Sequence, residues 1–250
     1  MARSVPSENA NNADNKSNDN SELAPDFPET DVTLVFEDRK IHVNKAVLSQ
    51  HSPVFKAMFS GSFKESTSSE IPLVDKKYKD VVEFLRCFYP NKERSITEQN
   101  VLQILPLAHE YQSPLITDCE KLLIDLCKPG TGLLLTSLLD YVIAAEKCDL
   151  DTLLDAAVEF CSHIGFDLLS GEMIRRESRS KNKPNKLMVL DSPRKWIFST
   201  NKNLSSKFSQ IGLKTRYTIA VKRLQVLEMN KCKADEGEQI EDDFDIGYFI

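Results

Sequence analysis

A stretch of alternating apolar residues, followed directly by helical spacing, is the feature that most constrains the fold. Residues 31–37 alternate apolar and other side chains in the way that is typical of a largely buried β-strand. A polar turn and a second short strand at 41–43 follow, so residues 31–43 predict a β-hairpin. Asn44 is placed to cap a short helix over 45–50. The ordered part of the chain therefore begins as strand, strand, helix.

Two Ser-Pro pairs mark further helix starts, because serine caps a helix and proline suits its first position. Ser52-Pro53 opens a helix that Gly61 ends, and Ser113-Pro114 opens another. Residues 71–74 predict a third strand, and Pro72 within it indicates an edge position or a strand end. These signals together predict a small sheet with helices around it.

Five more segments carry apolar residues at helical spacing: 77–89, a segment that begins after a Thr97 cap, 133–147, 151–164 and 203–229. Residues 171–192 lose this pattern and gain charge, which predicts an exposed linker between the last two of these helices.

Charge is unevenly distributed, with a basic stretch at 171–223 between an acidic N-terminus and acidic residues 231–250. The formal net charge of −6 does not by itself indicate a nucleic-acid-binding protein. Mean hydropathy is −0.34, and no apolar run approaches the roughly 20 residues of a membrane span, so we expect no membrane insertion. The N-terminus has no apolar core of a secretory signal and is rich in Asn, Ser and Asp, which predicts disorder.

The six cysteines form no CxxC pair, and without a secretion signal we expect reduced thiols, five of them within helical apolar patterns. The four histidines have no metal-ligand spacing with cysteine or with one another. No phosphate-binding loop or nucleophile elbow is present in the sequence. We therefore expect a protein that is not an enzyme, with no metal and no cofactor.

Residues 31–124 resemble a BTB/POZ domain. The matching segments occur in the family's order: Asp31 to Leu34, Val43 to Leu48, Ser52 to Phe59, Val81 to Tyr89, Ala108 to Tyr111, and Cys119-Glu120 with Leu122 and Leu123. The details are most similar to the BTB part of MATH-BTB cullin-3 adaptors, although Asn44-Lys45 stands where many relatives have His-Lys. The resemblance implies an α+β fold, with a small three-strand sheet and a cluster of helices, followed by a helical BACK-like extension.

The expected organisation has six parts: a disordered tail at 1–28, a BTB/POZ domain at 29–127, a BACK/3-box-like extension at 131–168, a basic linker at 171–195, a C-terminal helix at 196–230 and an acidic tail at 231–250. The linker's cluster of Arg175, Arg176, Arg179, Lys181, Lys183 and Lys186 is read as a solvated segment, with a nuclear localisation signal or an RNA-binding patch as alternatives. Aromatic residues are not interleaved in the cluster, which argues against nucleic acid as a partner.

The resemblance also implies a binding site for cullin-3. Phe63-Lys64-Glu65 matches the hydrophobic-x-Glu motif of BTB adaptors, and Phe59 and Tyr111 are expected to join it. An exposed Phe beside a Glu offers a buried anchor with an electrostatic rim. The alternative is that Phe63 folds back onto its own domain and Glu65 is merely solvated.

A dimer face is expected on the first two helices, because they hold more apolar residues than one side can bury. The residues assigned to it are Asp31, Asn44, Lys45, Val47, Leu48, Val54 and Phe55. Asp31 is expected to be a buried acid held by hydrogen bonds near Asn44 and Lys45, or else a simple turn residue at the strand start.

The function expected from these features is that of a homodimeric substrate adaptor for a cullin-3 ubiquitin ligase, located in the cytoplasm, the nucleus or both. Its partners would be a second copy, cullin-3 and a substrate protein that the sequence does not identify. Two alternatives remain: a BTB oligomerisation scaffold or transcription-associated protein without a ligase role, and a dimer that sequesters a partner without ubiquitylation. No MATH or kelch substrate-binding module is recognised in the sequence, which favours the alternatives.

Overall fold

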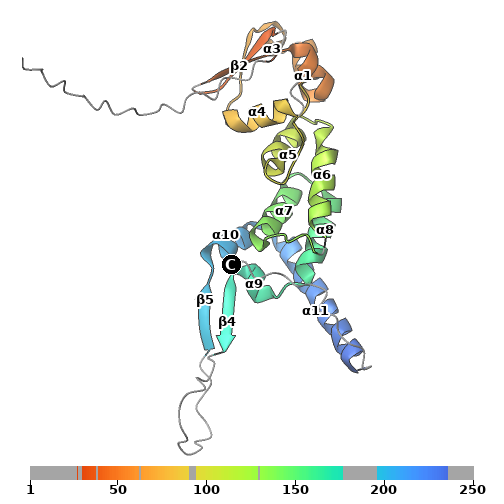
Figure 1. Cartoon of the computed structure of the whole chain (residues 1–250). Helices are drawn as coiled ribbons and strands as arrows, with labels where there is room; N and C mark the ends of the chain where they lie inside the picture. The colour runs from red at the N-terminus through yellow and green to blue at the C-terminus, as the bar shows by residue number, and fades with distance from the viewer. Residues whose placement is uncertain are drawn as a thin grey trace, which may run out of the picture.

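The computed structural model describes residues 27, 30–37, 39–61, 63–89, 94–128, 130–176 and 196–235. The molecule is elongated, with a small sheet and its helices at one end, stacked helices in the middle, and a hairpin and a long helix diverging at the other end (Figure 1). Among the described residues, none of the helices has the length and apolar character to cross a membrane.

The small sheet consists of β1 (Val32–Val35), β2 (Lys40–Val43) and β3 (Glu70–Pro72), in the order β2-β1-β3. β1 pairs antiparallel with β2 and parallel with β3, so that Leu34 lies opposite both Ile41 and Ile71. All three side chains are buried, and they form the core face of the sheet. The predicted hairpin and the edge position of Pro72 are confirmed.

Four helices surround this sheet: α1 (Lys45–His51), α2 (Pro53–Ser60), the short α3 (Lys64–Thr67) and α4 (Tyr78–Arg86). The Asn44 side chain accepts a hydrogen bond from the Val47 amide at 3.1 Å, and Ser52 Oγ accepts one from the Phe55 amide at 3.1 Å. The N-caps predicted at Asn44 and Ser52 are therefore present, since each satisfies an amide that the helix start leaves without a partner.

The next two helices are α5 (Val101–Glu110) and α6 (Leu115–Leu126). The predicted cap at Thr97 is wrong, because α5 begins one turn later, after Asn100. The buried Asn100 side chain accepts from the Thr97 amide at 2.7 Å and donates to the Ser95 carbonyl at 3.2 Å. These bonds hold residues 97–100 as a turn rather than as the first turn of the helix.

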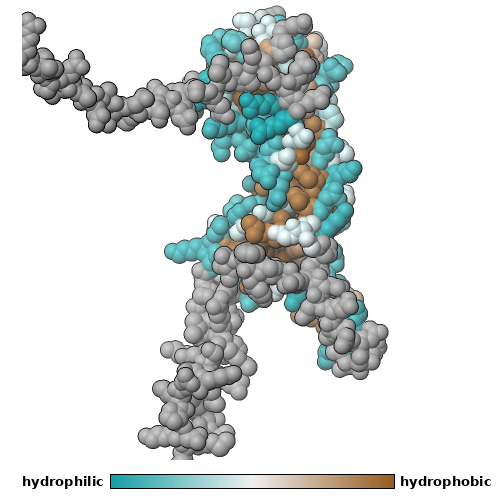
Figure 2. Space-filling model, viewed as in Figure 1, coloured by the Kyte–Doolittle hydropathy of each residue, from teal (hydrophilic) through white to brown (hydrophobic). Residues whose placement is uncertain are grey.

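The helical extension contains α7 (Leu135–Lys147), α8 (Asp151–Ser162), α9 (Phe166–Ser170), α10 (Lys202–Gln210) and α11 (Leu213–Asp235). α10 packs on α7, and α11 packs along α8. One cluster of buried apolar side chains is continuous from Leu34 in the sheet to Ile219 in α11, so the extension shares its core with the first domain. Figure 2 shows apolar residues reaching the surface along the middle of the molecule.

The C-terminal part corrects two expectations. Where the sequence predicts a linker over 171–195, β4 (Glu172–Arg176) pairs antiparallel with β5 (Trp196–Thr200). Where a single helix is expected over 196–230, β5, α10 and α11 follow one another, and α11 continues to Asp235. Gly171 precedes the hairpin with φ 71°, and a Cβ there would lie 2.7 Å from the Asn201 carbonyl oxygen, so the close approach of these segments requires glycine.

The assigned start of the first domain also differs from the structure. Phe27, placed in the disordered tail by the sequence, is 4% exposed, and its ring packs against Tyr89 with the ring centroids 4.2 Å apart and the planes tilted by 46°. Residues 1–26, most of the predicted basic linker and the acidic residues beyond 235 lie outside the described residues.

Candidate protein-binding site

A groove of about 460 Å³ lies between α2, the segment that leads into α3, and the turn after α5. Four of its lining residues belong to α2, and Phe63 and Glu65 line it as well. The full lining is Pro53, Val54, Ala57, Met58, Phe63, Glu65 and Gln112. The structure therefore brings together the two residues that define the predicted motif. Ala57, Met58 and Gln112 line the groove as well and were not identified from the sequence.

Phe63 is the most exposed aromatic residue of this groove, with 59% of its surface accessible. Its backbone is fixed by Ser66, whose hydroxyl donates to the Phe63 carbonyl at 2.7 Å and whose amide donates to it at 3.1 Å. A Cβ added at Gly61 would lie 2.9 Å from the Phe63 ring, so the ring rests against the end of α2. The Phe63 ring therefore touches its own domain on one side and leaves more than half of its surface accessible.

Lys45 ties this segment to α1. Its ammonium group donates to the Ser66 carbonyl at 3.2 Å and to the Ser68 carbonyl at 3.3 Å, and it lies 5.5 Å from the centre of the half-buried Phe59 ring. The ammonium group of Lys45, a residue that the sequence analysis assigned to the dimer face, therefore points toward α3. Phe59 lies beneath this contact rather than in the lining of the groove.

Tyr111, which the resemblance assigned to the cullin-binding site, is a core residue and does not line the groove. Its side chain is 5% exposed and stacks on Phe55, with ring centroids 4.4 Å apart and planes 8° from parallel. Burial raises the pKa of its phenol to about 12, and Glu110 adds to this shift. Gln112, the next residue, reaches the groove because its backbone has φ 50°, a turn conformation that helical periodicity does not indicate.

The predicted polar contact at the start of the dimer face is present, but Asp31 is exposed rather than buried. Its carboxylate accepts a 2.7 Å hydrogen bond from the Lys45 amide, and its own amide donates to the Val43 carbonyl at 3.0 Å. The Asn44 amide donates to the Tyr89 hydroxyl at 2.6 Å. These bonds fix the entry into α1 and do not require a buried charge.

The apolar members of the predicted dimer face divide into two pairs. Leu48 and Phe55 are 0% and 1% exposed, so they belong to the core of their own chain and do not supply surface for a second copy. Val47 and Val54 are half-buried, and Val54 lines the groove. Helical spacing located the apolar face of each helix correctly, but it could not indicate how much of that face the rest of the domain covers.

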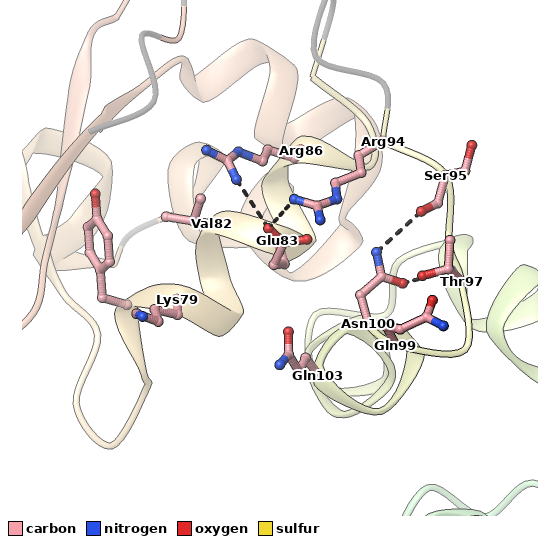
Figure 3. A pocket seen from close by; sticks show the side chains of 11 residues that line it. Lys79, Val82, Glu83, Arg86, Arg94, Ser95, Thr97, Gln99, Asn100 and Gln103 are labelled. Atoms are coloured by element: carbon pink, nitrogen blue, oxygen red, sulfur yellow. Dashed lines mark hydrogen bonds and ion pairs between the residues drawn. The ribbon is translucent and has the colours of Figure 1, made fainter. Parts of the chain in front are cut away.

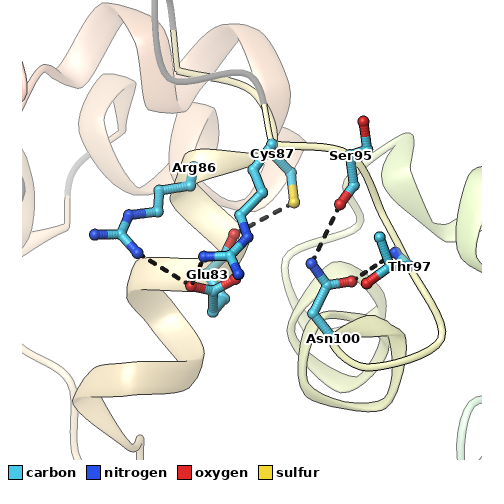
Figure 4. A network of polar contacts seen from close by, with 7 residues as sticks. Glu83, Arg86, Cys87, Ser95, Thr97 and Asn100 are labelled. Carbon is cyan, nitrogen blue, oxygen red and sulfur yellow. Dashed lines mark hydrogen bonds and ion pairs between the residues drawn. The ribbon is translucent and has the colours of Figure 1, made fainter.

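A second, polar hollow of about 630 Å³ lies between α4 and the segment that leads into α5 (Figure 3). Glu83 Oε1 accepts from Arg86 at 3.1 Å and from Arg94 at 2.7 Å (Figure 4). The Cys87 thiol donates to the Glu83 carbonyl at 3.3 Å, and burial together with the Glu83 charge raises its pKa to about 11. This network joins α4 to the segment before α5. No group of three or more potential metal ligands occurs in the part of the chain that the structure describes.

The comparisons with known proteins agree with this geometry. Residues 25–126 match the BTB/POZ domain family. BTB and MATH domain-containing protein 38 of Caenorhabditis elegans is 38% identical over 95 residues, which cover 38% of this chain and 24% of that protein. BTB and MATH domain-containing protein 36 of the same organism is 32% identical over 132 residues, covering 52% of this chain and 38% of that protein.

Kelch-like protein 7 of Rattus norvegicus is 31% identical over 130 residues, covering 52% of this chain and 21% of that protein. This chain therefore spans well under half the length of these three relatives. Residues 25–126 form a BTB/POZ domain, and the chain carries this protein-interaction module with the α+β fold that the sequence predicted.

Proposed function

We propose that the chain is a homodimeric substrate adaptor that recruits cullin-3 through the groove of α2, Phe63 and Glu65. The exposure of Phe63 beside Glu65, in a groove on a BTB/POZ domain, is the observation that carries the proposal. Ubiquitin transfer would be catalysed by the partner subunits. The role of the chain would be to hold a bound substrate near those subunits.

The chemistry of the groove supports a protein partner. Phe63 offers a large apolar surface to a protein partner, and Val54 and Met58 offer apolar walls that exclude water around such an anchor. Glu65, half-buried at the same groove, adds a charge that orients the approach of a complementary partner. Interface hot spots are typically large side chains that become desolvated within surrounding contacts that exclude water.

The fixed backbone of the motif also favours binding. The Lys45 ammonium bonds to the carbonyls of Ser66 and Ser68, and the Ser66 hydroxyl bonds to the Phe63 carbonyl. A segment held in this way loses little conformational entropy when a partner binds, so more of the contact energy appears as affinity.

The experiment that tests the proposal mixes the purified chain with the N-terminal region of cullin-3 and measures molar mass by light scattering after size exclusion. We expect one peak containing two chains and two cullin fragments. A dimer of the chain that elutes apart from the cullin fragment at tens of micromolar of each would contradict the proposal. That result would favour an oligomerisation scaffold or a sequestering dimer without a ligase role.

A further inference from the structure

The long helix α11 carries apolar side chains on two opposite faces. Its inner face packs along α8, where Thr215, Ile219 and Val226 are buried. The Lys222 ammonium on this side forms a 2.9 Å ion pair with Glu159 of α8. An amphipathic helix normally buries one apolar face against its own domain, and in α11 this inner face does so.

The outer face carries a second apolar row, which we call the outer stripe: Leu213, Tyr217, Leu224 and Leu227. These side chains are 77%, 70%, 60% and 47% exposed, respectively. Together with Ala220 they follow one another at alternating steps of four and three residues, the spacing of a seam against which another segment packs. Proteins rarely leave a contiguous row of large apolar side chains in water, so we expect another segment to cover the stripe.

The charges of α11 favour an acidic occupant. The helix contains six basic residues and two acidic ones. Lys214 is exposed beside the stripe, and Lys231 continues its spacing at the C-terminal end. A second α11 would bring like charges together along the seam, which disfavours pairing with another copy.

Residues 236–250 match these requirements in composition. They contain six acidic residues and no basic residue, and they also contain Ile240, Phe244, Ile246 and Tyr248, with Phe249 and Ile250 at the end. A purely solvated acidic segment has few aromatic and branched apolar residues. This segment therefore combines the charge and the apolar side chains that complement the outer stripe.

The length of the segment is sufficient. It follows α11 directly, and 15 residues in extended form reach about 50 Å, whereas a 23-residue helix is about 35 Å long. Gly237 stands two residues beyond the helix, and glycine is the residue type that most readily reverses a chain at that position. Residues 236–250 can therefore return along the whole stripe.

We propose that residues 236–250 pack on the outer stripe of α11 in the same chain. The apolar side chains of the segment cover Tyr217, Leu224 and Leu227, and its carboxylates lie near Lys214 and Lys231. The proposal is independent of cullin binding.

The test is hydroxyl-radical footprinting of the full chain, with labelling of each residue measured by mass spectrometry. The wild type is compared with a variant that carries Phe244→Ser, Ile246→Ser and Tyr248→Ser. We expect labelling of Tyr217 and Leu224 to rise at least about threefold in the variant as the stripe becomes exposed. Met229 is the internal control, because it is 57% exposed on α11 but does not belong to the stripe, and its labelling should not change.

Two outcomes would overturn the proposal. Equal labelling of Tyr217 and Leu224 in both proteins, independent of concentration, would show that the segment leaves the stripe uncovered. Equal labelling that falls as the chain concentration rises would identify a second copy, or another α11, as the occupant. The far-ultraviolet circular dichroism spectra of the two proteins should coincide, since the substitutions lie beyond the end of α11.

Discussion

The Ser52 hydroxyl joins the start of α2 to the end of α5, because it donates a 2.6 Å hydrogen bond to the Tyr111 carbonyl oxygen. Ser52 Oγ also accepts a hydrogen bond from the Phe55 amide at 3.1 Å, so one buried hydroxyl caps a helix and links two segments 59 residues apart. The Phe55 and Tyr111 rings stack directly beside this bond. Ser52 therefore ties the start of α2, which lines the candidate groove, to the turn that carries Gln112.

Ser52→Ala should lower the free energy of unfolding by about 2 kcal/mol, since it removes an N-cap and leaves a buried carbonyl without its donor. Urea denaturation followed by circular dichroism measures this change. Ser60→Ala, at the exposed end of the same helix, is the matched control and should change stability by less than about 0.5 kcal/mol. Equal effects of the two substitutions would show that the link to Tyr111 contributes nothing.

Lys45→Met should loosen the Phe63–Glu65 segment without unfolding the domain. Methionine keeps the apolar stem but lacks the ammonium donors to Ser66 and Ser68. Hydrogen exchange of the amides at 64–67 should become faster. Cullin affinity should fall about fivefold, which corresponds to about 1 kcal/mol. Lys56→Met, on the exposed surface of α2, should change neither quantity; unchanged exchange in Lys45→Met would remove Lys45 from this role.

Self-association is expected to depend on the outer side of α1. Sedimentation equilibrium at tens of micromolar should give twice the chain mass of 28.4 kDa. Val47→Glu should shift the chain toward monomer, because a charge at the two-fold contact would have to be desolvated. Val74→Glu, at a residue 72% exposed after β3, is the control and should remain dimeric. A monomeric wild type would refute the dimer.

The cysteines should differ sharply in their reaction with a thiol reagent at pH 8. Burial raises the pKa of Cys87 and Cys127 to about 11 and that of Cys119 to about 12, so their thiolate fractions at pH 8 are very small. Cys232 is the exposed cysteine. We expect one fast thiol per native chain, and Cys232→Ser should abolish this phase. A fast phase that persists in Cys232→Ser would show that a buried helix opens readily.

Local signals in the sequence predicted much of the first domain. The alternation over 31–37 and the Ser52-Pro53 helix start act between near neighbours, and the structure contains both the hairpin and the capped helix. Burial was harder to predict, because Leu48 and Phe55 look like surplus apolar surface until the packing of α5 and α6 is known. The β4–β5 pair joins segments about twenty residues apart, and no local pattern specifies such a pairing.

The candidate site was predictable to a similar extent. The Phe63–Glu65 motif was visible in the sequence because the resemblance fixed its place, and the structure puts both residues in one groove. Gln112 was missed because its position depends on a positive φ after α5. Tyr111 was placed in the site by the resemblance, and helical spacing could not show that its ring packs into the core.

The affinity of Phe63→Ala for the N-terminal region of cullin-3, measured by titration calorimetry, tests the proposed function most directly. Loss of an exposed aromatic anchor should weaken binding at least about 30-fold, equivalent to about 2 kcal/mol, with no change in the melting temperature. Val74→Ala, at an exposed apolar residue outside the groove, should bind like the wild type. Wild-type affinity in a folded Phe63→Ala protein would contradict the proposal that this groove recruits cullin-3.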